Sequence, residues 1–339
     1  MEPEISALDP ADQAVVAGAQ AVRVAAEAVD VPDFPPPCEH AFRGELTFPT
    51  TVRRKERFVA RRAGEVVGYL CLELPLRDNL ENAELELVVH PAHRRHGIGR
   101  ALHAYARSRL RELGRKRYAA YSVETLPGGP EREGAGTHFG HAVGAKPAIT
   151  EVRRRLDLTT MDEAKLAEVR DAAAAKAAGY RLVHWQNRTP DEYVADAGYL
   201  SSRLVSDAPM GDLQWEVPRV DVDRVREREA QIAAGKQRIY ATGAVHEATG
   251  RLVAVTDLAV DHSSPWHAWQ WITLVEPRHR GHRLGALVKT ENLRFLREHE
   301  PELRIINTWN AAVNDHMISI NEAMGFRPVD SWVNWQQEV

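Results

Sequence analysis

The chain has 339 residues, of which 27% are charged, and a formal net charge of −4 at pH 7. It is long enough for two domains of roughly 170 residues, and its mean hydropathy of −0.41 is typical of a globular protein. Its two cysteines lie far apart, which excludes a disulfide framework and a cysteine-rich zinc module. No stretch approaches the roughly 20 apolar residues of a membrane helix, the first residues lack signal-peptide features, and the charge disfavours nucleic-acid binding. We therefore expect a cytoplasmic protein with no membrane and no nucleic-acid partner.

The first half of the chain predicts helices and strands in alternation. Asp9 and Pro10 are typical of a helix start, and alanine-rich sequence extends that helix to about residue 29. A proline-rich break follows at residues 32–37. The next expected elements are strands near residues 57–60, 66–74 and 84–89, an amphipathic helix over 100–113 and a strand near 118–122.

The second half repeats this order. Helices are expected near residues 191–205 and 222–234, and strands near 238–247, 252–260 and 269–275. A turn at 280–285 then opens a helix to about residue 299, before a strand over 304–309 and a helix over 314–324. Strand–turn–helix units mixed with antiparallel meanders predict a mixed α/β (α+β) fold.

An internal repeat relates the two halves. Residues 64–70 match 250–256, and residues 88–99 match 274–285, both at an offset of 186 positions. A third match, of residues 144–147 with 325–328, has a slightly smaller offset. We therefore expect two copies of one domain, over residues 1–158 and 179–339. The intervening residues 159–178 are rich in Ala, Glu and Lys, which predicts a helical linker.

Each copy has a glycine turn between a strand and a helix. The first reads Arg94-Arg95-His96-Gly97-Ile98-Gly99, and the second Arg280-Gly281-His282-Arg283-Leu284-Gly285. Glycine lets the backbone approach a ligand closely, and the helix start offers unpaired N–H groups, so each turn is suited to a pyrophosphate. Neither a P-loop nor a Rossmann fingerprint is present.

The two turns resemble the pyrophosphate loop of the GNAT N-acetyltransferase superfamily, Arg/Gln-x-x-Gly-x-Gly/Ala. Asn310, Asn314 and the pair Gly325-Phe326 resemble that family's late strand–helix segment. Because the resemblance spans most of both halves, the chain resembles a tandem GNAT protein arranged like mycothiol synthase. It implies two GNAT domains, each a mostly antiparallel mixed sheet flanked by helices, with acetyl-CoA as acyl donor and no metal.

The resemblance also implies which residues bind acetyl-CoA. Backbone N–H groups at each strand end would meet the thioester oxygen, and the turn would bind the pyrophosphate. The expected binding residues are Val88, Val89, Arg94, Arg95, His96, Gly97, Ile98, Gly99 and Arg100 in the first copy, and Leu274, Val275, Arg280, Gly281, His282, Arg283, Leu284, Gly285, Asn310 and Asn314 in the second. Arg283 departs from the family pattern, because it stands where the first glycine is expected.

Direct acetyl transfer needs a base that removes a proton from the amine. Glu84 and Glu86 are two residues apart on a strand and share one face, which could also be a solvated face. In the second copy Gln270 and Ile272 align with them, which leaves Asp257 on the preceding strand as the candidate carboxylate.

The late segment supplies one more catalytic candidate and one departure from the family. Asn314 is that candidate, although it could instead hydrogen-bond the strand or the pantetheine. The tyrosine that serves many GNAT enzymes as general acid is replaced by Gly140 and Asn321. Because this segment is more complete in the second copy, we expect catalysis there, with the first copy binding CoA or stabilising the pair.

The predicted function is acetyl transfer from acetyl-CoA to an amine of a small molecule, such as an antibiotic or a metabolite, by a monomer or homodimer. One alternative is acetylation of a protein or peptide amine. Another is a non-catalytic CoA-binding sensor, which is consistent with the missing tyrosine.

Overall fold

The computed structural model describes residues 2–339, which form two compact units. Neither unit is one continuous stretch of chain. Unit 1 contains the residues up to Glu151 together with Met210–Glu216 and Asp330–Val339. Unit 2 contains Val152–Pro209 and Val217–Val329.

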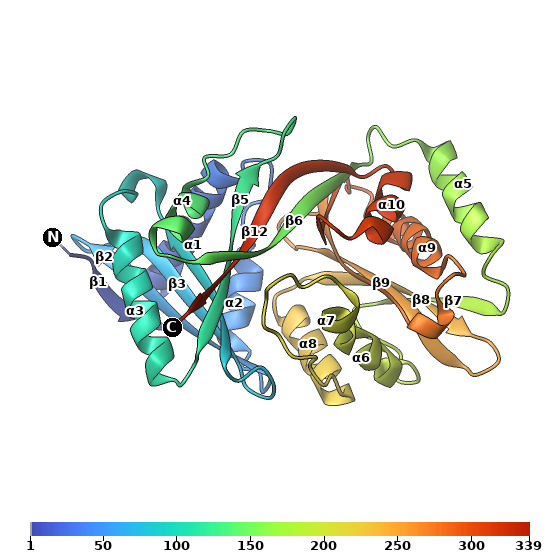
Figure 1. Ribbon diagram of the computed structural model, residues 1–339, viewed down its shortest axis with the longest axis horizontal. Coiled ribbons are helices and arrows are strands. Elements are labelled where there is room, and N and C mark those ends of the chain that lie inside the picture. The colour runs from blue at the N-terminus through green and yellow to red at the C-terminus, as the bar shows by residue number, and fades with distance from the viewer. Residues whose placement is uncertain (1) are drawn as a thin grey trace. The chain divides into compact units, whose positions relative to one another are not determined.

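Unit 1 is built on a sheet with the strand order β1-β2-β3-β4-β5-β12 (Figure 1). Neighbouring strands are antiparallel except β4 and β5, which are parallel. The elements of this unit are β1 (Glu4–Ala7), α1 (Gln13–Asp30), α2 (Glu39–Thr47), β2 (Arg53–Arg62), β3 (Glu65–Pro75), β4 (Asn82–Val89), α3 (Ile98–Glu112), β5 (Arg117–Thr125), α4 (Ala135–Ala142) and most of β12 (Arg327–Glu338).

Unit 2 repeats the plan, with the strand order β6-β11-β10-β9-β8-β7 and a parallel pair of β10 with β11. Its elements are the end of β6 (Lys146–Asp157), α5 (Glu163–Ala174), β7 (Tyr180–Gln186), α6 (Val194–Ser202), α7 (Leu204–Asp207), α8 (Val222–Ala234), β8 (Arg238–His246), β9 (Arg251–Val260), β10 (His267–Val275), α9 (Leu284–His299), β11 (Ile305–Ala311) and α10 (Asp315–Ala323). The predicted mixed α/β fold, mostly antiparallel and flanked by helices, is confirmed.

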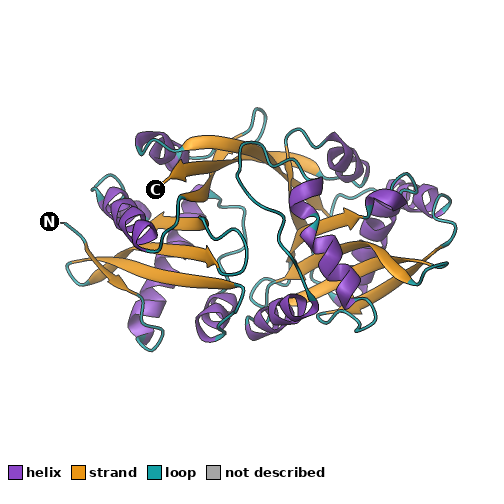
Figure 2. Ribbon diagram, turned by 60° about the horizontal axis from the view of Figure 1, so that its bottom comes forward, coloured by secondary structure: helices purple, strands orange, loops and turns teal. Residues whose placement is uncertain are grey.

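Helices cover both faces of the sheet in unit 1, as Figure 2 shows. Successive residues of a strand point to opposite faces. On β3, Tyr69 and Cys71 accordingly join the core cluster of α1 and α2, whereas Leu70 and Leu72 join that of α3. The register of β3 with β4 then places Glu84 and Glu86, among others, on the face of α1 and α2.

Helix α1 begins three residues later than the sequence predicts. The side chain of Asp12 accepts hydrogen bonds from the N–H groups of Ala14 and Val15, both at 3.1 Å. Asp9 instead accepts from the N–H of Ala11 at 2.9 Å, in the turn before the helix. Both aspartates can cap, and the capping position falls at the second one.

The sequence does not predict β6 and β12, the last strand of each repeat. β12 pairs with β5 in unit 1, from Asp330 opposite Thr125 to Glu338 opposite Arg117. Residues 152–157 of β6 belong to unit 2, where Leu156 is buried in a core cluster. The boundaries of the compact units therefore differ from the expected domain boundaries at residues 158 and 179. The expected domains were defined by the sequence repeat, and they stay a prediction.

The parallel pair separates early in both sheets. β4 pairs with β5 only over Asn82–Glu84, and β10 pairs with β11 only over His267–Trp269. Beyond these points the two strands of each pair diverge. A gap of this kind exposes backbone N–H and C=O groups to a ligand.

A bulge in β10 changes which residues of the two copies are structurally equivalent. The register of β10 with β9 shifts between Gln270 and Thr273. Glu84 lies opposite Glu73 in unit 1, and Trp269 lies opposite Ala259, the repeat equivalent of Glu73. Trp269 rather than Gln270 therefore occupies the place of Glu84, because the bulge adds one residue.

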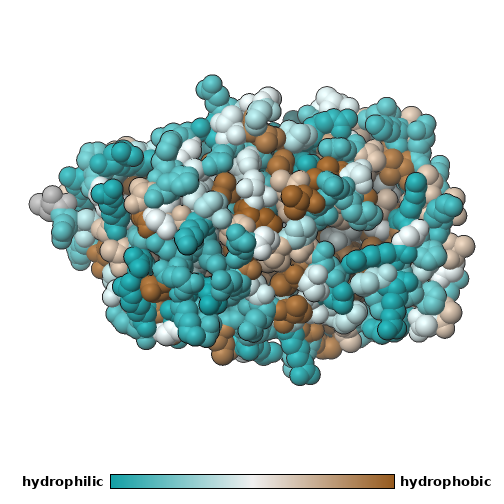
Figure 3. All heavy atoms as spheres, viewed as in Figure 1, coloured by the Kyte–Doolittle hydropathy of each residue, from teal (hydrophilic) through white to brown (hydrophobic). Residues whose placement is uncertain are grey.

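Polar side chains cover much of the face shown in Figure 3. Within residues 2–339, no helix combines the length and the apolar character that crossing a bilayer requires.

Candidate active site

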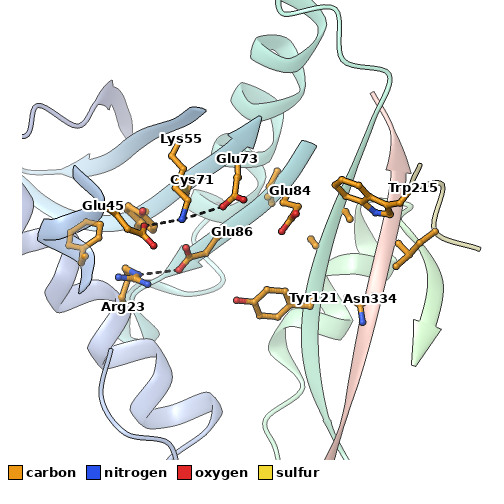
Figure 4. Close-up of a pocket in the computed structure, with 16 residues that line it drawn as sticks. Arg23, Glu45, Lys55, Cys71, Glu73, Glu84, Glu86, Tyr121, Trp215 and Asn334 are labelled. Atoms are coloured by element: carbon orange, nitrogen blue, oxygen red, sulfur yellow. Dashed lines mark hydrogen bonds and ion pairs between the residues drawn. The ribbon is translucent and has the colours of Figure 1, made fainter. Parts of the chain in front are cut away.

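Unit 1 contains a pocket of about 390 Å³ at the point where β4 separates from β5 (Figure 4). Residues of β2, β3, β4 and β5 form its floor, and residues of α1, α2 and the segment 213–215 form its walls. The volume lies within the range of roughly 300–1,000 Å³ that is usual for small-molecule sites.

Carboxylates dominate the floor of this pocket. Glu84 and Glu86 on β4 both line it, and Glu73 on β3 lies directly opposite Glu84 in the antiparallel ladder. Glu45, on α2, adds a fourth carboxylate. The sequence predicted the pair on β4, but the register was needed to bring Glu73 beside it.

Each cation near the floor is engaged by a carboxylate. Arg23 on α1 donates to Glu86 at 3.1 Å, and Lys55 on β2 lies 3.0 Å from Glu45 and 3.2 Å from Glu73. Arg53, also on β2, bonds Glu73 and lies 3.2 Å from Glu84. The pocket therefore holds a network of alternating charges rather than a free cation.

The charges around Glu84 and Glu73 shift the pKa values of these two neighbouring carboxyl groups in opposite directions. Burial and the charge of Glu73 raise the pKa of Glu84, despite the opposing effect of Arg53. Burial acts on Glu73 too, but Lys55 and Arg53 outweigh it and lower the pKa of that carboxyl. Glu84 is therefore the member of the pair that takes up a proton first.

Two further pocket residues were missed in the sequence. Burial raises the pKa of Cys71 to about 12, so the thiol stays protonated and is a poor nucleophile near neutral pH. Tyr121 points from β5 towards the carboxylates in Figure 4, and its side chain is largely exposed. Only the register of four strands could have placed these residues together.

The two glycine turns have the same backbone conformation, with glycine and arginine exchanged between the two left-handed positions. In unit 1 the left-handed positions are Arg95 (φ +64°) and Gly97 (φ +83°). In unit 2 the same positions are Gly281 (φ +87°) and Arg283 (φ +54°). Arg283 thus adopts the conformation of the expected glycine, at a steric cost that glycine avoids.

The chain is similar to known acetyltransferases. Residues 24–126 match the model of the acetyltransferase (GNAT) family. A tandem GNAT protein from the clavulanic acid biosynthesis pathway, solved without AcCoA, is 36% identical over 99% of this chain and 98% of its own, with a TM-score of 0.85. The chain belongs to the GNAT acetyltransferase family. It is a tandem GNAT protein and an N-acetyltransferase.

More distant structures share the fold of this tandem GNAT protein. A GCN5-related N-acetyltransferase from Sphaerobacter thermophilus is 13% identical, covers 99% of this chain and 95% of its own, and has a TM-score of 0.64. A glucosamine N-acetyltransferase region of a fungal multi-domain β-N-acetylglucosaminidase is 15% identical over 99% of this chain and 38% of that one, with a TM-score of 0.68. No curated protein matches the chain.

The first residue of each GNAT loop anchors the loop to its own unit. Arg94 bonds Asp30 with two nitrogens, at 2.6 and 2.8 Å, and Glu133 at 2.6 Å. Arg280 in unit 2 bonds Asp207 at 2.9 Å. Both of these arginines therefore fix the loop, and in this structure they are occupied by carboxylates rather than open to an anion.

The rest of each loop fits a pyrophosphate. Helices α3 and α9 start without a side-chain cap, so their first N–H groups stay available to an anion. Arg95, His96, Gly97 and Arg100 are exposed around the start of α3, and Gly281, His282 and Arg283 are exposed around that of α9. Ile98 and Leu284, the first helical residues, are buried and hold the helix starts in place.

Other residues proposed for CoA binding take equivalent places in the two units. Val88 packs against the α1 cluster and Val89 against the α3 cluster, and Leu274 and Val275 divide between faces in the same way. A Cβ on Gly99 would lie 3.3 Å from the ring of Phe139, whereas one on Gly285 would lie 3.5 Å from Ile320. Gly99 thus avoids a tight contact with α4, whereas a side chain at Gly285 would meet only ordinary packing.

The candidate base of unit 2 is enclosed. Asp257 is 7% exposed and accepts the N–H of Ile272, within the bulge, at 3.0 Å. Burial raises its pKa, although Arg228 at 3.9 Å opposes this. These contacts give Asp257 a role in holding the bulge.

The asparagines of the late segment support helix α10. Asn314 caps it by accepting the N–H of Met317 at 3.3 Å. Asn310 accepts a hydrogen bond at 2.6 Å from Asn321, which is fully buried where many GNAT enzymes have tyrosine. Gly140, the corresponding residue of unit 1, packs against Trp335, so no phenol occupies either place.

Metal ligands do not gather in this structure. Among residues 2–339, no group of three or more His, Cys, Asp or Glu side chains is arranged to hold a metal ion.

Proposed function

We propose that the protein transfers an acetyl group from acetyl-CoA to the primary amine of a small molecule, and that the amine binds in the pocket of unit 1. The main support for this proposal is the position of the pocket, which lies where β4 separates from β5 and is lined by Glu84 and Glu86. The fuller late segment led us to expect catalysis in the second copy. The open carboxylates of unit 1 and the enclosed Asp257 of unit 2 instead favour unit 1.

The loop of unit 1 would hold the pyrophosphate of acetyl-CoA. Arg95 and Arg100 supply exposed positive charge, and the uncapped N–H groups of α3 supply donors. Acetyl-CoA, when bound, supplies the acetyl group as a thioester. Backbone N–H groups of β4 beyond Glu84, up to Val88 and Val89, would stabilise charge that develops on the carbonyl oxygen.

Glu84 would remove the proton from the ammonium group of the acceptor. Its raised pKa gives its carboxylate a greater proton affinity than an ordinary glutamate has, and half of its side chain is exposed to the pocket. Glu86, held by Arg23, would attract and orient the ammonium group. Because Cys71 stays a thiol, the amine rather than the protein would receive the acetyl group.

The size of the pocket favours a small acceptor over a folded protein. A cavity of about 390 Å³ matches a metabolite-sized ligand. A peptide amine remains the alternative acceptor, since a lysine side chain would also fit such a volume.

The test is an assay of CoA thiol release with acetyl-CoA and a panel of small primary amines, with mass spectrometry of the product. We expect release that depends on the amine, together with an acetylated product. Release that is equal with and without amine across the panel would contradict the proposal. A lysine-containing peptide in the same panel distinguishes the alternative acceptor.

A further inference from the structure

One wall of the acceptor pocket comes from a distant part of the chain. Residues 210–216, which we call the strap, lie between α7 and α8 yet belong to unit 1. From residue 213 to residue 220 the backbone forms neither helix nor strand. Leu213 and Trp215 nevertheless line the pocket, and Trp215 stands at its edge in Figure 4.

Side-chain amides hold the strap by its backbone. Asn79 donates to the carbonyl of Glu216 at 3.0 Å and accepts from the N–H of the same residue at 2.6 Å. Asn82 donates to the carbonyl of Gln214 at 2.6 Å, and Gln336 accepts from the N–H of Gln214 at 2.9 Å.

These hydrogen bonds fix the path of the strap without involving its side chains. Asn79 is 8% exposed and Asn82 is 4% exposed, so both amides are shielded from water, which makes their hydrogen bonds costly to lose. The side chains of Leu213 and Trp215 take no part in them. A rigid backbone that presents uncommitted side chains to a pocket is suited to selecting a ligand.

The pocket offers a ligand two kinds of surface. In Figure 4, Arg23 and Lys55 lie on one side of Glu84 and Glu86, and Tyr121 and Trp215 lie on the other. The two cations are already paired with carboxylates, so they offer little to an acidic group. The aromatic rings are the surface left for the part of the acceptor that does not react.

We propose that Trp215 is the specificity-determining residue of this pocket, and that it selects small primary amines with an apolar ring-shaped body and no acidic group. The proposal rests on the function proposed above. The ammonium group faces Glu84 and Glu86, and the ring of the acceptor packs on the indole of Trp215. A carboxylate on the acceptor would lie beside Glu84 and Glu86, while Arg23 and Lys55 are already paired and would not compensate it.

The test compares three probes on the full chain: benzylamine, ethylamine and phenylglycine, which adds a carboxylate to benzylamine. We expect Trp215→Ala to lower kcat/KM for benzylamine about tenfold, mainly by raising KM, and to change ethylamine less than about twofold. Phenylglycine is expected to be a poorer substrate than benzylamine for the native protein. Trp215→Phe, which keeps an aromatic ring, is expected to restore most of the loss.

Trp271→Ala is the matched control, because Trp271 lies in the bulge of unit 2 beneath Arg228. We expect it to leave the ranking of the three probes unchanged. The proposal is overturned if Trp271→Ala, rather than Trp215→Ala, removes the preference for benzylamine. It is also overturned if Trp215→Ala affects benzylamine and ethylamine equally, or if phenylglycine is preferred.

Calorimetric binding of benzylamine in the presence of CoA separates this inference from the proposed function. If no probe supports CoA release but benzylamine binds in a Trp215-dependent manner, the proposed acetyl transfer is at fault and the inference stands. Binding that Trp215→Ala does not weaken, or no binding to the native protein, overturns the inference. Folding of each variant is checked by circular dichroism, and Trp215→Leu replaces any Ala variant that is unfolded.

Discussion

The two units have matching strands but different side chains on the sheet face that carries Glu84 in unit 1. Across the strands at the level of Glu84, unit 1 carries Lys55, Glu73 and Glu84, whereas the equivalent positions of unit 2 carry Ile239, Ala259 and Trp269. At the next level, unit 1 carries Arg57, Cys71 and Glu86, whereas unit 2 carries Ala241, Asp257 and the bulge at Trp271 and Ile272.

This difference contrasts with the glycine turns, which keep one backbone shape in both units. A loop shape depends on a few φ angles, so exchanging Gly and Arg between its two left-handed positions preserves it. The floor of the pocket depends on side-chain chemistry at several strand positions, and the bulge in β10 shifts the residues that correspond to Glu84 and Glu86. The backbone of the loop is therefore the same in both units, whereas the side chains of this strand face differ.

The largest effect is expected from neutralising one carboxylate in each unit. We expect Glu84→Gln to reduce kcat by about 100-fold or more, because the amide cannot accept the proton of the acceptor. Asp257→Asn keeps an oxygen for the N–H of Ile272 and is expected to leave kcat within about twofold, since no reacting group depends on it. Steady-state kinetics with a shared amine measures both. The opposite ranking of the two variants would return catalysis to unit 2.

The pH dependence of kcat/KM tests the role of Glu84 as the base. Glu84 acts as a base only when ionised, so kcat/KM rises as the pH rises through its pKa. Burial and Glu73 raise that pKa, which places the acid limb above the ordinary glutamate value of about 4.3. Glu73→Gln removes the neighbouring charge, so the acid limb is expected to move to lower pH. A pH–rate profile that is identical for both proteins would contradict the assignment.

The smallest expected effects distinguish the two loops. Arg95→Gly and Arg283→Gly each relieve a left-handed non-glycine residue, so each is expected to increase the free energy of unfolding, by about 0.5–1 kcal/mol, in urea titrations. Only Arg95→Gly is expected to raise the KM for acetyl-CoA, by about threefold to tenfold, because the proposed turnover uses the loop of unit 1. An equal rise in both variants would show that both loops serve the reaction.

Local sequence patterns were enough to predict several elements. The amphipathic helix after each glycine turn, the strands before it and the pair Glu84 and Glu86 on one strand face follow from periodicities of 3.6 and 2. The repeat revealed two copies because it holds one offset across separate segments. The GNAT loop was readable because its Arg and Gly positions lie within six residues of one another in the chain.

The residues that surround Glu84 could be identified only from the folded chain. Glu73 and Tyr121 reach it through strand register, and Trp215 reaches the pocket through a strap held by Asn79 and Asn82. Register, bulges and long-range clamps depend on contacts between segments far apart in the chain, which leave no periodic signal in the sequence. For the same reason the sequence predicted a glycine turn suited to an anion in each copy, while the fold was needed to show that Glu84 and Glu86 line a pocket in unit 1.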